Sequence, residues 1–156
     1  MRIVIIGYPG SGKEALADYI ENRYYCAKLC LDQISFPNET KERSLALTED
    51  LLSRFMKDNI SWVIEGDDFN VLFDERMEMA DKIVIMKYRR LSCLVKYLRR
   101  MRKEKKEVDS AYINWLLFGS RNKEHRDRYN SVMRKYSDKT VMIFNDMQLF
   151  MLRDLI

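Results

Sequence analysis

The sequence is poor in the residues that build disulfide frameworks, zinc sites and loose linkers. Its 156 residues include three cysteines, two prolines, five glycines and one histidine. Cys26, Cys30 and Cys93 lack the paired spacing of a disulfide framework or a metal site, so we expect structural thiols in a reducing compartment. No internal repeat or low-complexity stretch interrupts the chain, which predicts a single domain over residues 1–156.

Long apolar runs and a leader segment are also missing. No hydrophobic stretch approaches the roughly 20 residues of a membrane span, and residues 2–7 look like a strand with no signal peptide ahead of them. Hydrophobic residues make up 47% of the chain and charged residues 33%, as in globular proteins. We therefore expect a cytoplasmic protein with no membrane partner.

Three of the few glycines stand close together, directly after an apolar run. Ile3–Ile6 predict a buried strand, and the segment GYPGSGK follows at residues 7–13. Backbone N–H groups of such a loop surround a phosphate, and the lysine neutralises its charge. The helix that begins at the lysine directs the positive end of its dipole at the same anion. The pattern predicts a phosphate-binding loop of the Walker A type that contains Gly7, Tyr8, Pro9, Gly10, Ser11, Gly12, Lys13 and Glu14.

The loop departs from the full motif at its last position. A Ser or Thr normally follows the lysine, and its hydroxyl holds Mg²⁺; here Glu14 and Ala15 follow. One interpretation makes the Glu14 carboxylate a direct or water-mediated magnesium ligand. The other makes Glu14 a first-turn acid that stabilises the helix N-terminus by about 0.3–1 kcal/mol.

Short apolar segments alternate with helical patterns along the rest of the chain. The strands are continuously apolar, which is typical of a parallel sheet covered on both faces. Their expected positions are residues 2–7, 27–31, 61–64, 82–86 and 140–144. Helices are expected at residues 12–22, after a Thr48 cap, at 70–79 after an Asn70 cap, at 110–118, at 121–136 and after an Asp146 cap. Residues 36–44, with Pro37, predict a loop.

Acidic residues stand where ligands bind in parallel sheets, beyond the carboxyl ends of the strands. Asp32 follows the second strand and is a candidate for orienting or deprotonating an acceptor hydroxyl, or for forming a turn. Glu65, followed by Gly66, Asp67 and Asp68, is a candidate for holding the waters of Mg²⁺. The same string is also a plausible turn.

Basic residues gather after the fourth strand. Residues 87–106 contain a single acid, Glu104, and aromatic residues are interleaved with the basic ones. A helix here is expected to bury Leu91, Leu94, Val95, Leu98 and Met101. The basic residues fit either a lid that stabilises a transferring phosphoryl group or a nucleic-acid surface. By position, the candidates for phosphate contact are Arg99, Arg100, Arg121 and Arg126.

These features together resemble a known group of proteins. GYPGSGK is similar to the GxPGxGK loop of adenylate kinases and related nucleoside-monophosphate kinases. Trp62–Gly66 resembles the WVIDGN segment of the small bacterial "DNA topology modulation" proteins. Similar pairs occur at Leu31-Asp32, Leu72-Phe73, Glu75-Arg76 and Ala80-Asp81. The resemblance implies a three-layer α/β P-loop NTPase fold with a five-stranded parallel sheet in the order 2-3-1-4-5 and a helical lid at about 99–128.

Three positions depart from that group. Both hydroxyls after the loop lysine are replaced, at Glu14 and Ala15; Glu65 stands where an aspartate is expected; and residues 103–109 lack the proline-bearing stretch of the lid. The phosphate-binding loop is therefore intact, while the positions expected to bind Mg²⁺ are altered.

The resemblance and the residues lead to two hypotheses. The first is an ATP- and Mg²⁺-dependent kinase that transfers the γ-phosphoryl group of ATP to a nucleotide or another small acceptor. Its catalytic candidates are Lys13, Asp32, Arg99, Arg100, Arg121 and Arg126, and its metal candidates are Glu65 and Glu14. The alternative is a nucleotide-binding regulatory protein with weak or no transfer activity that contacts DNA through its basic lid. The segment Phe36–Thr40, where the acceptor is expected, carries no motif that identifies the acceptor.

Overall fold

The computed structural model describes residues 1–36 and 43–155. Most of the predicted loop at 36–44, including Pro37, therefore lies outside the described residues. Five strands form one sheet in the order β2-β3-β1-β4-β5, which confirms the predicted order. Their bounds are β1 Arg2–Gly7, β2 Ala27–Cys30, β3 Trp62–Glu65, β4 Lys82–Met86 and β5 Thr140–Ile143.

The three strands on one side of the sheet are parallel and in close register. Ile5 of β1 lies beside Glu65 of β3, and Glu65 lies beside Cys30 of β2. Side chains on both faces of β1 and β3 are buried, as expected for a parallel sheet covered on both sides. Because the register is shared, the three strands end at nearly the same level. The segments that follow them therefore start at one edge of the sheet.

The chain divides into two compact units. The first contains Met1–Ile6 and Lys13–Ile83, and the second contains Gly7–Gly12 and Val84–Ile156. Helices of the first unit are α1 Lys13–Tyr24, α2 Leu31–Ser35, α3 Leu45–Asp58 and α4 Phe73–Met79. Helices of the second are α5 Arg90–Glu104, α6 Ser110–Leu117, the short 3₁₀ helix η1 Gly119–Arg121, α7 Lys123–Lys135 and α8 Asp146–Leu155.

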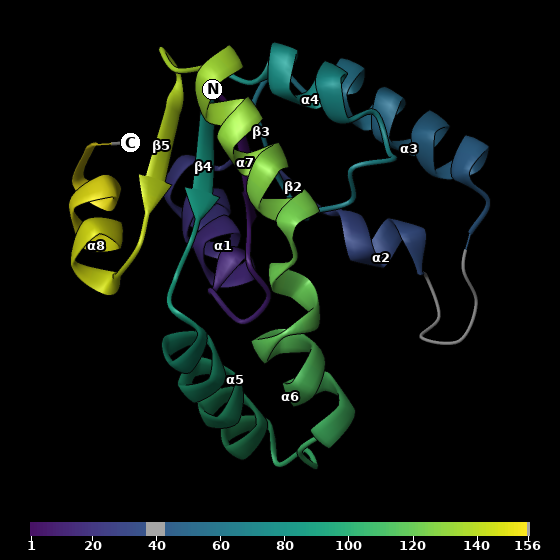
Figure 1. The fold of residues 1–156 in the computed structure, drawn as a ribbon. Helices are drawn as coiled ribbons and strands as arrows, with labels where there is room; N and C mark the ends of the chain where they lie inside the picture. Colours follow the sequence, from purple (N-terminus) through teal and green to yellow (C-terminus); the bar gives the residue numbers. More distant parts are fainter. Residues whose placement is uncertain (37–42, 156) are drawn as a thin grey trace. The chain divides into compact units, whose positions relative to one another are not determined.

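In the first unit, α1 packs against β2 and β3. It buries Leu16, Ala17 and Ile20. Helix α2 begins directly after β2 and contacts α3 (Figure 1). The sequence did not predict α2, because its five residues are too few to show a helical period.

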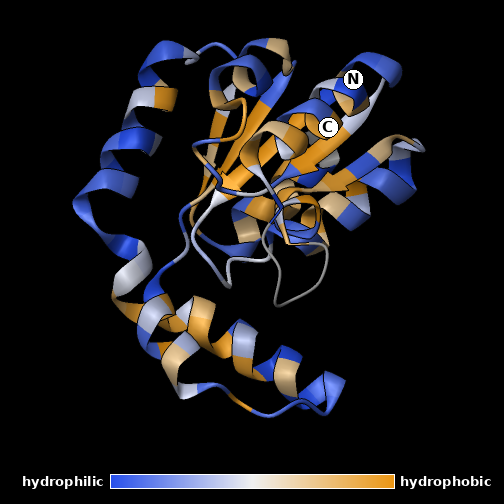
Figure 2. Ribbon diagram, turned by 90° about the vertical axis from the view of Figure 1, so that its right-hand side faces the viewer, coloured by the Kyte–Doolittle hydropathy of each residue, from blue (hydrophilic) through white to orange (hydrophobic). Residues whose placement is uncertain are grey.

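In the second unit, α5 and α6 lie side by side as a helical hairpin (Figure 1). Tyr97 of α5 contacts Tyr112 of α6, with ring centroids 4.8 Å apart. Helices α7 and α8 both contact β5. Apolar residues concentrate in the strands, whereas the helices mix polar and apolar residues (Figure 2). Over the described part of the chain, no helix is long and apolar enough to cross a membrane.

Three predicted helix caps are wrong. Helix α3 begins at Leu45 after Ser44, so Thr48 lies inside the helix and its hydroxyl donates to the Ser44 carbonyl, 3.1 Å away. Helix α4 begins at Phe73 rather than after Asn70. Asp146 is the first residue of α8, and the Asn145 side chain accepts the Gln148 N–H at 3.0 Å instead.

The predicted apolar face of α5 is confirmed at Met101 and wrong at three other positions. The helix buries Cys93, Tyr97 and Met101, which recur every four residues. Leu91, Val95 and Leu98 are exposed. The prediction followed the spacing of the aliphatic residues, whereas the helix buries a cysteine, a tyrosine and a methionine. This shift of the buried face determines which basic residues of α5 point toward the rest of the second unit.

Candidate phosphate-binding site

The glycine loop connects β1 to α1 through a backbone that needs glycine. Gly7, Gly10 and Gly12 have φ angles of 143°, 72° and 99°. A Cβ at Gly7 would collide with the backbone carbonyl of Met86. The next residue, Tyr8, donates its N–H to that carbonyl at 3.1 Å, so the loop leaves the strand in tight contact with β4. Substitution at Gly7 is excluded by both the φ angle and this contact.

Ser11 is a buried residue of the loop with an unsatisfied hydroxyl. Its side chain is fully buried, and Oγ has no hydrogen-bond partner among the described residues. The Ser11 N–H donates to the Tyr8 carbonyl at 3.2 Å, which closes the turn. A buried polar atom without a partner is rare and costly. Ser11 therefore packs inside the loop, and its side chain is closed off from solvent.

Arg121 is the predicted arginine that contacts the loop. Its guanidinium carbon lies 4.0 Å from the centroid of the Tyr8 ring, and Nη2 lies 3.3 Å from the Cys93 sulfur. Tyr8 in turn contacts Tyr129 edge-to-face, with centroids 5.4 Å apart. Cation–π stacking on a buried tyrosine fixes the guanidinium beside the loop.

Lys13 is the first residue of α1 and meets acids from two strand ends. Its ammonium lies 3.8 Å from Oδ2 of Asp67. Asp32, in the first turn of α2, stands at the surface. Partial desolvation raises the pKa of Asp32, Lys13 lowers it, and Asp67 raises it again. The first unit thus brings together the lysine and the acid that the sequence predicts for the acceptor side.

Glu65 ends β3 with a side chain that is only 5% exposed. Desolvation raises its pKa, while a hydrogen bond from the Cys30 thiol and the charge of Lys13 lower it. Burial and the same carboxylate raise the pKa of Cys30 to about 12, so the thiol stays protonated and donates. The strand register explains this pair, because Cys30 is the neighbour of Glu65 on β2.

Arg76 lies in the same region, although no role was predicted for it. Its side chain is fully buried on α4 and donates to the carbonyls of Gly66 (3.3 Å) and Asp68. Desolvation lowers its pKa to about 10 despite the neighbouring acids. Phe73 lies against its guanidinium, 5.4 Å from the ring centroid. Arg76 therefore fixes the backbone of the turn that carries Asp67. An arginine within an acidic helix was the only signal in the sequence.

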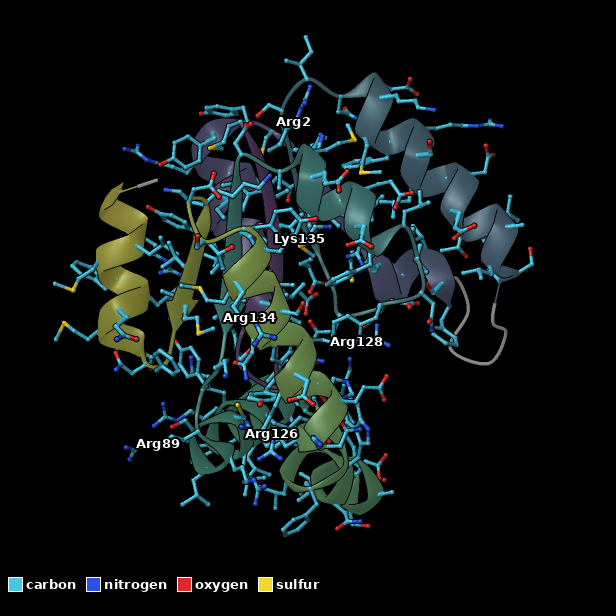
Figure 3. All side chains as sticks on the ribbon, turned by 45° about the horizontal axis from the view of Figure 1, so that its top comes forward. Arg2, Arg89, Arg126, Arg128, Arg134 and Lys135 are labelled. Carbon is cyan, nitrogen blue, oxygen red and sulfur yellow. The ribbon has the colours of Figure 1, made fainter. Side chains whose placement is uncertain are left out.

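The other predicted arginines stand at the surface. Arg99 and Arg100 are exposed on α5, and Nε of Arg100 lies 3.5 Å from Oε1 of Glu104. Arg126 is exposed on α7, and Figure 3 shows it with Arg128, Arg134 and Lys135 along that helix. Their contact with phosphate stays a prediction.

The metal candidates differ in their surroundings. Glu14 is exposed in the first turn of α1, and its charge raises the pKa of buried Glu65. Within the described ranges, no group of three or more His, Cys, Asp or Glu residues could hold a metal ion. A magnesium ion bound mainly by nucleotide phosphates and water needs only one or two carboxylates. The carboxylates of Glu14 and Glu65 fit magnesium that is held mainly by nucleotide phosphates and water.

The basic surface of α7 is mixed in charge. A shallow hollow along the helix is lined by Lys123, Glu124, Asp127, Arg128, Ser131 and Arg134. Arg128 pairs with Glu124 at 2.8 Å. Acids within the surface weaken its attraction for a nucleic-acid backbone. Direct contact with DNA stays a prediction.

The five-stranded parallel sheet in the order β2-β3-β1-β4-β5, with helices around it, is a fold that the chain shares with solved structures. One solved structure to which the chain is similar is the crystal structure of shikimate kinase from Bacteroides thetaiotaomicron, with a TM-score of 0.51 and 20% sequence identity over 93% of this chain and 86% of that chain. No family model matches the sequence, and no curated protein matches it. The resemblance to the DNA topology modulation group stays a prediction.

Arg76→Met should destabilise the protein. The substitution leaves two backbone carbonyls without donors, and each buried unsatisfied group costs about 1–3 kcal/mol. Removal of a desolvated charge offsets part of this cost, so we expect a net loss of about 1–3 kcal/mol in urea unfolding. Arg54→Met, at an exposed position of α3, is the control and should change stability little. A variant as stable as the parent would show that Arg76 does not support the turn.

Glu65→Gln should stabilise the ligand-free protein at pH 7. The raised pKa of folded Glu65 means that its ionised form costs stability above its ordinary value of 4.5. The gain should shrink as the pH falls toward 4.5, where Glu65 becomes protonated in the folded state. Urea unfolding between pH 4.5 and 8 measures this, with exposed Glu107→Gln as the control. A gain that does not depend on pH would contradict the desolvation argument.

Proposed function

We propose that the protein is an ATP-dependent kinase acting on a small molecule. The observation that carries this proposal is the glycine loop that ends at Lys13, with its positive φ angles. Such loops bind nucleotide phosphates on backbone N–H groups at a helix N-terminus. The similar solved structure is named as a kinase, which agrees with the proposal.

Each proposed role follows from the chemistry of the residue. Lys13 offsets the charge that moves between the β- and γ-phosphates. Asp32, whose pKa Lys13 influences, orients the acceptor hydroxyl. Arg121 contacts the phosphoryl group from beside Tyr8, and Arg99, Arg100 and Arg126 join it from the lid at about 99–128.

Mg²⁺ would be carried on the nucleotide, with Glu65 holding its waters. When bound, the ion neutralises phosphate charge during transfer. We assign Glu14 the second role left open by the sequence, that of a first-turn acid, since its side chain is exposed. Positioning and electrostatics then supply most of the catalysis.

The acceptor is a nucleotide or another small molecule that presents a hydroxyl or phosphate. We place the activity in the cytoplasm, in a single domain of 156 residues, in agreement with the thiols and the resemblance to nucleoside-monophosphate kinases. A protein that binds ATP but transfers no phosphoryl group to any acceptor would be the regulatory alternative.

Lys13→Ala should weaken ATP binding by about tenfold or more, because a charge-assisted contact with phosphate is lost. The melting temperature without ligand should change little, since the lysine side chain is partly exposed. Titration calorimetry with ATP measures the affinity, and Lys57→Ala at an exposed position of α3 is the control. Absence of ATP binding by the folded parent at millimolar concentration would refute the proposed function.

Glu14→Thr should raise the affinity for ATP with Mg²⁺. The substitution removes a negative charge near the phosphates and restores a hydroxyl at the position that holds the metal in the full motif. Stability without ligand should fall by a fraction of about 1 kcal/mol, because a first-turn acid is lost. Affinities with and without Mg²⁺ are measured for both proteins. Weaker binding of ATP with Mg²⁺ by the variant would identify Glu14 as a metal ligand instead.

A further inference from the structure

A lysine that the sequence did not single out lies against the glycine loop. The Lys96 ammonium, on α5, is 3.3 Å from the Ser11 carbonyl oxygen. A Cβ at Gly12 would lie 3.9 Å from the same nitrogen, so Lys96 stands beside the last glycine before Lys13. The buried face of α5, built on Cys93, Tyr97 and Met101, turns Lys96 toward the loop.

Two residues from other segments hold Lys96 in this place. Oδ1 of Asp146, at the start of α8, lies 2.6 Å from the ammonium. The buried Tyr88 donates a hydrogen bond from its hydroxyl to the same oxygen at 2.9 Å. The centroid of its ring lies 3.9 Å from the lysine nitrogen. The hydrogen bond from Lys96 is the main cause that lowers the pKa of Asp146, so the carboxylate remains charged. The lysine is therefore oriented before any ligand arrives.

We propose that Lys96 is a second phosphate-binding residue of the loop and that Asp146 is the positioning residue that holds it there. This inference rests on the proposed function and names a residue of the same site.

An ammonium group has three N–H donors, and within the described residues Lys96 directs two of them at the Ser11 carbonyl and Asp146. The Lys96 side chain is 27% exposed, so a ligand can reach it. A phosphate oxygen at the loop would accept a hydrogen bond from the ammonium. A lysine whose rotamers are already fixed loses little entropy when it binds.

The test compares ligands that differ only in phosphate number. Titration calorimetry with ATP, ADP, AMP and adenosine is performed on the parent, Lys96→Met, Lys96→Arg, Asp146→Asn and the control Lys103→Met, an exposed lysine of the same helix. Lys96→Met should weaken the binding of ATP and ADP by about tenfold and leave the binding of adenosine unchanged. Lys96→Arg, which keeps the positive charge, should lose less affinity for ATP and ADP. Asp146→Asn should weaken the binding of ATP and ADP less than Lys96→Met does. Lys103→Met should leave the affinity for every ligand unchanged.

Coupling between the two residues is a further readout. If Asp146 acts through Lys96, the double variant Lys96→Met/Asp146→Asn should bind ATP as Lys96→Met does. Unchanged ATP affinity in Lys96→Met, or an equal loss for adenosine, would overturn the proposal while leaving the proposed function intact. A folded parent that binds no ATP would overturn both. If Lys96→Met does not fold, the ATP affinity of Asp146→Asn tests the proposal. This variant should fold, because the Asp146 side chain is 74% exposed.

Discussion

The shared register of three parallel strands is the constraint on which the acidic side of the site depends. Ile5, Glu65 and Cys30 are neighbours across β1, β3 and β2. Gly66 then donates its N–H to the Ile5 carbonyl at 3.1 Å, and a Cβ at Gly66 would lie 2.7 Å from the Leu31 Cβ. Only glycine fits between the two strand ends. The chain after β3 is thereby held close to the start of α2, where Asp32 stands.

Desolvation dominates the electrostatics of this region. It raises the pKa of Glu65 and of Asp32 and lowers the pKa of Arg76. A charged group that is partly desolvated costs stability unless a partner compensates it, and here the partners are shared among several groups. Lys13 is the shared partner here, because its charge lowers the pKa of both Asp32 and Glu65. The buried Arg76 keeps the turn in place without neutralising any carboxylate directly.

The sequence predicts the fold well because the signals are local. Each strand is a short apolar run, and the observed bounds differ from the predicted ones by no more than a residue at each end. The glycine loop and Lys13 are likewise a local motif. The buried face of α5 was not predictable in the same way, because the helix prefers to bury Cys93 and Tyr97 over Leu91 and Val95. That preference depends on α6 and the loop, which are distant in the sequence.

The same limit applies to Arg76 and Lys96. Arg76 acts on carbonyls eight and ten residues away, and Lys96 acts on a carbonyl 85 residues away and on a carboxylate 50 residues away. The residues next to Arg76 and Lys96 in the sequence give no sign of such distant partners. The phosphate contacts were predicted for arginines from their positions in the sequence, and the structure places one of them, Arg121, against Tyr8 of the loop.

The start of α8 shows how Asp146 becomes available to Lys96. An acid at a helix start commonly caps the helix by accepting backbone N–H groups. Here Asn145 takes that role with the Gln148 N–H, and the Gln148 side chain accepts the Phe144 N–H at 2.7 Å. This reciprocal arrangement resembles a capping box and satisfies the helix start without Asp146. The Asp146 carboxylate is then left for Tyr88 and Lys96, so the cap of the last helix and the orientation of a lysine at the glycine loop are parts of one hydrogen-bonded arrangement.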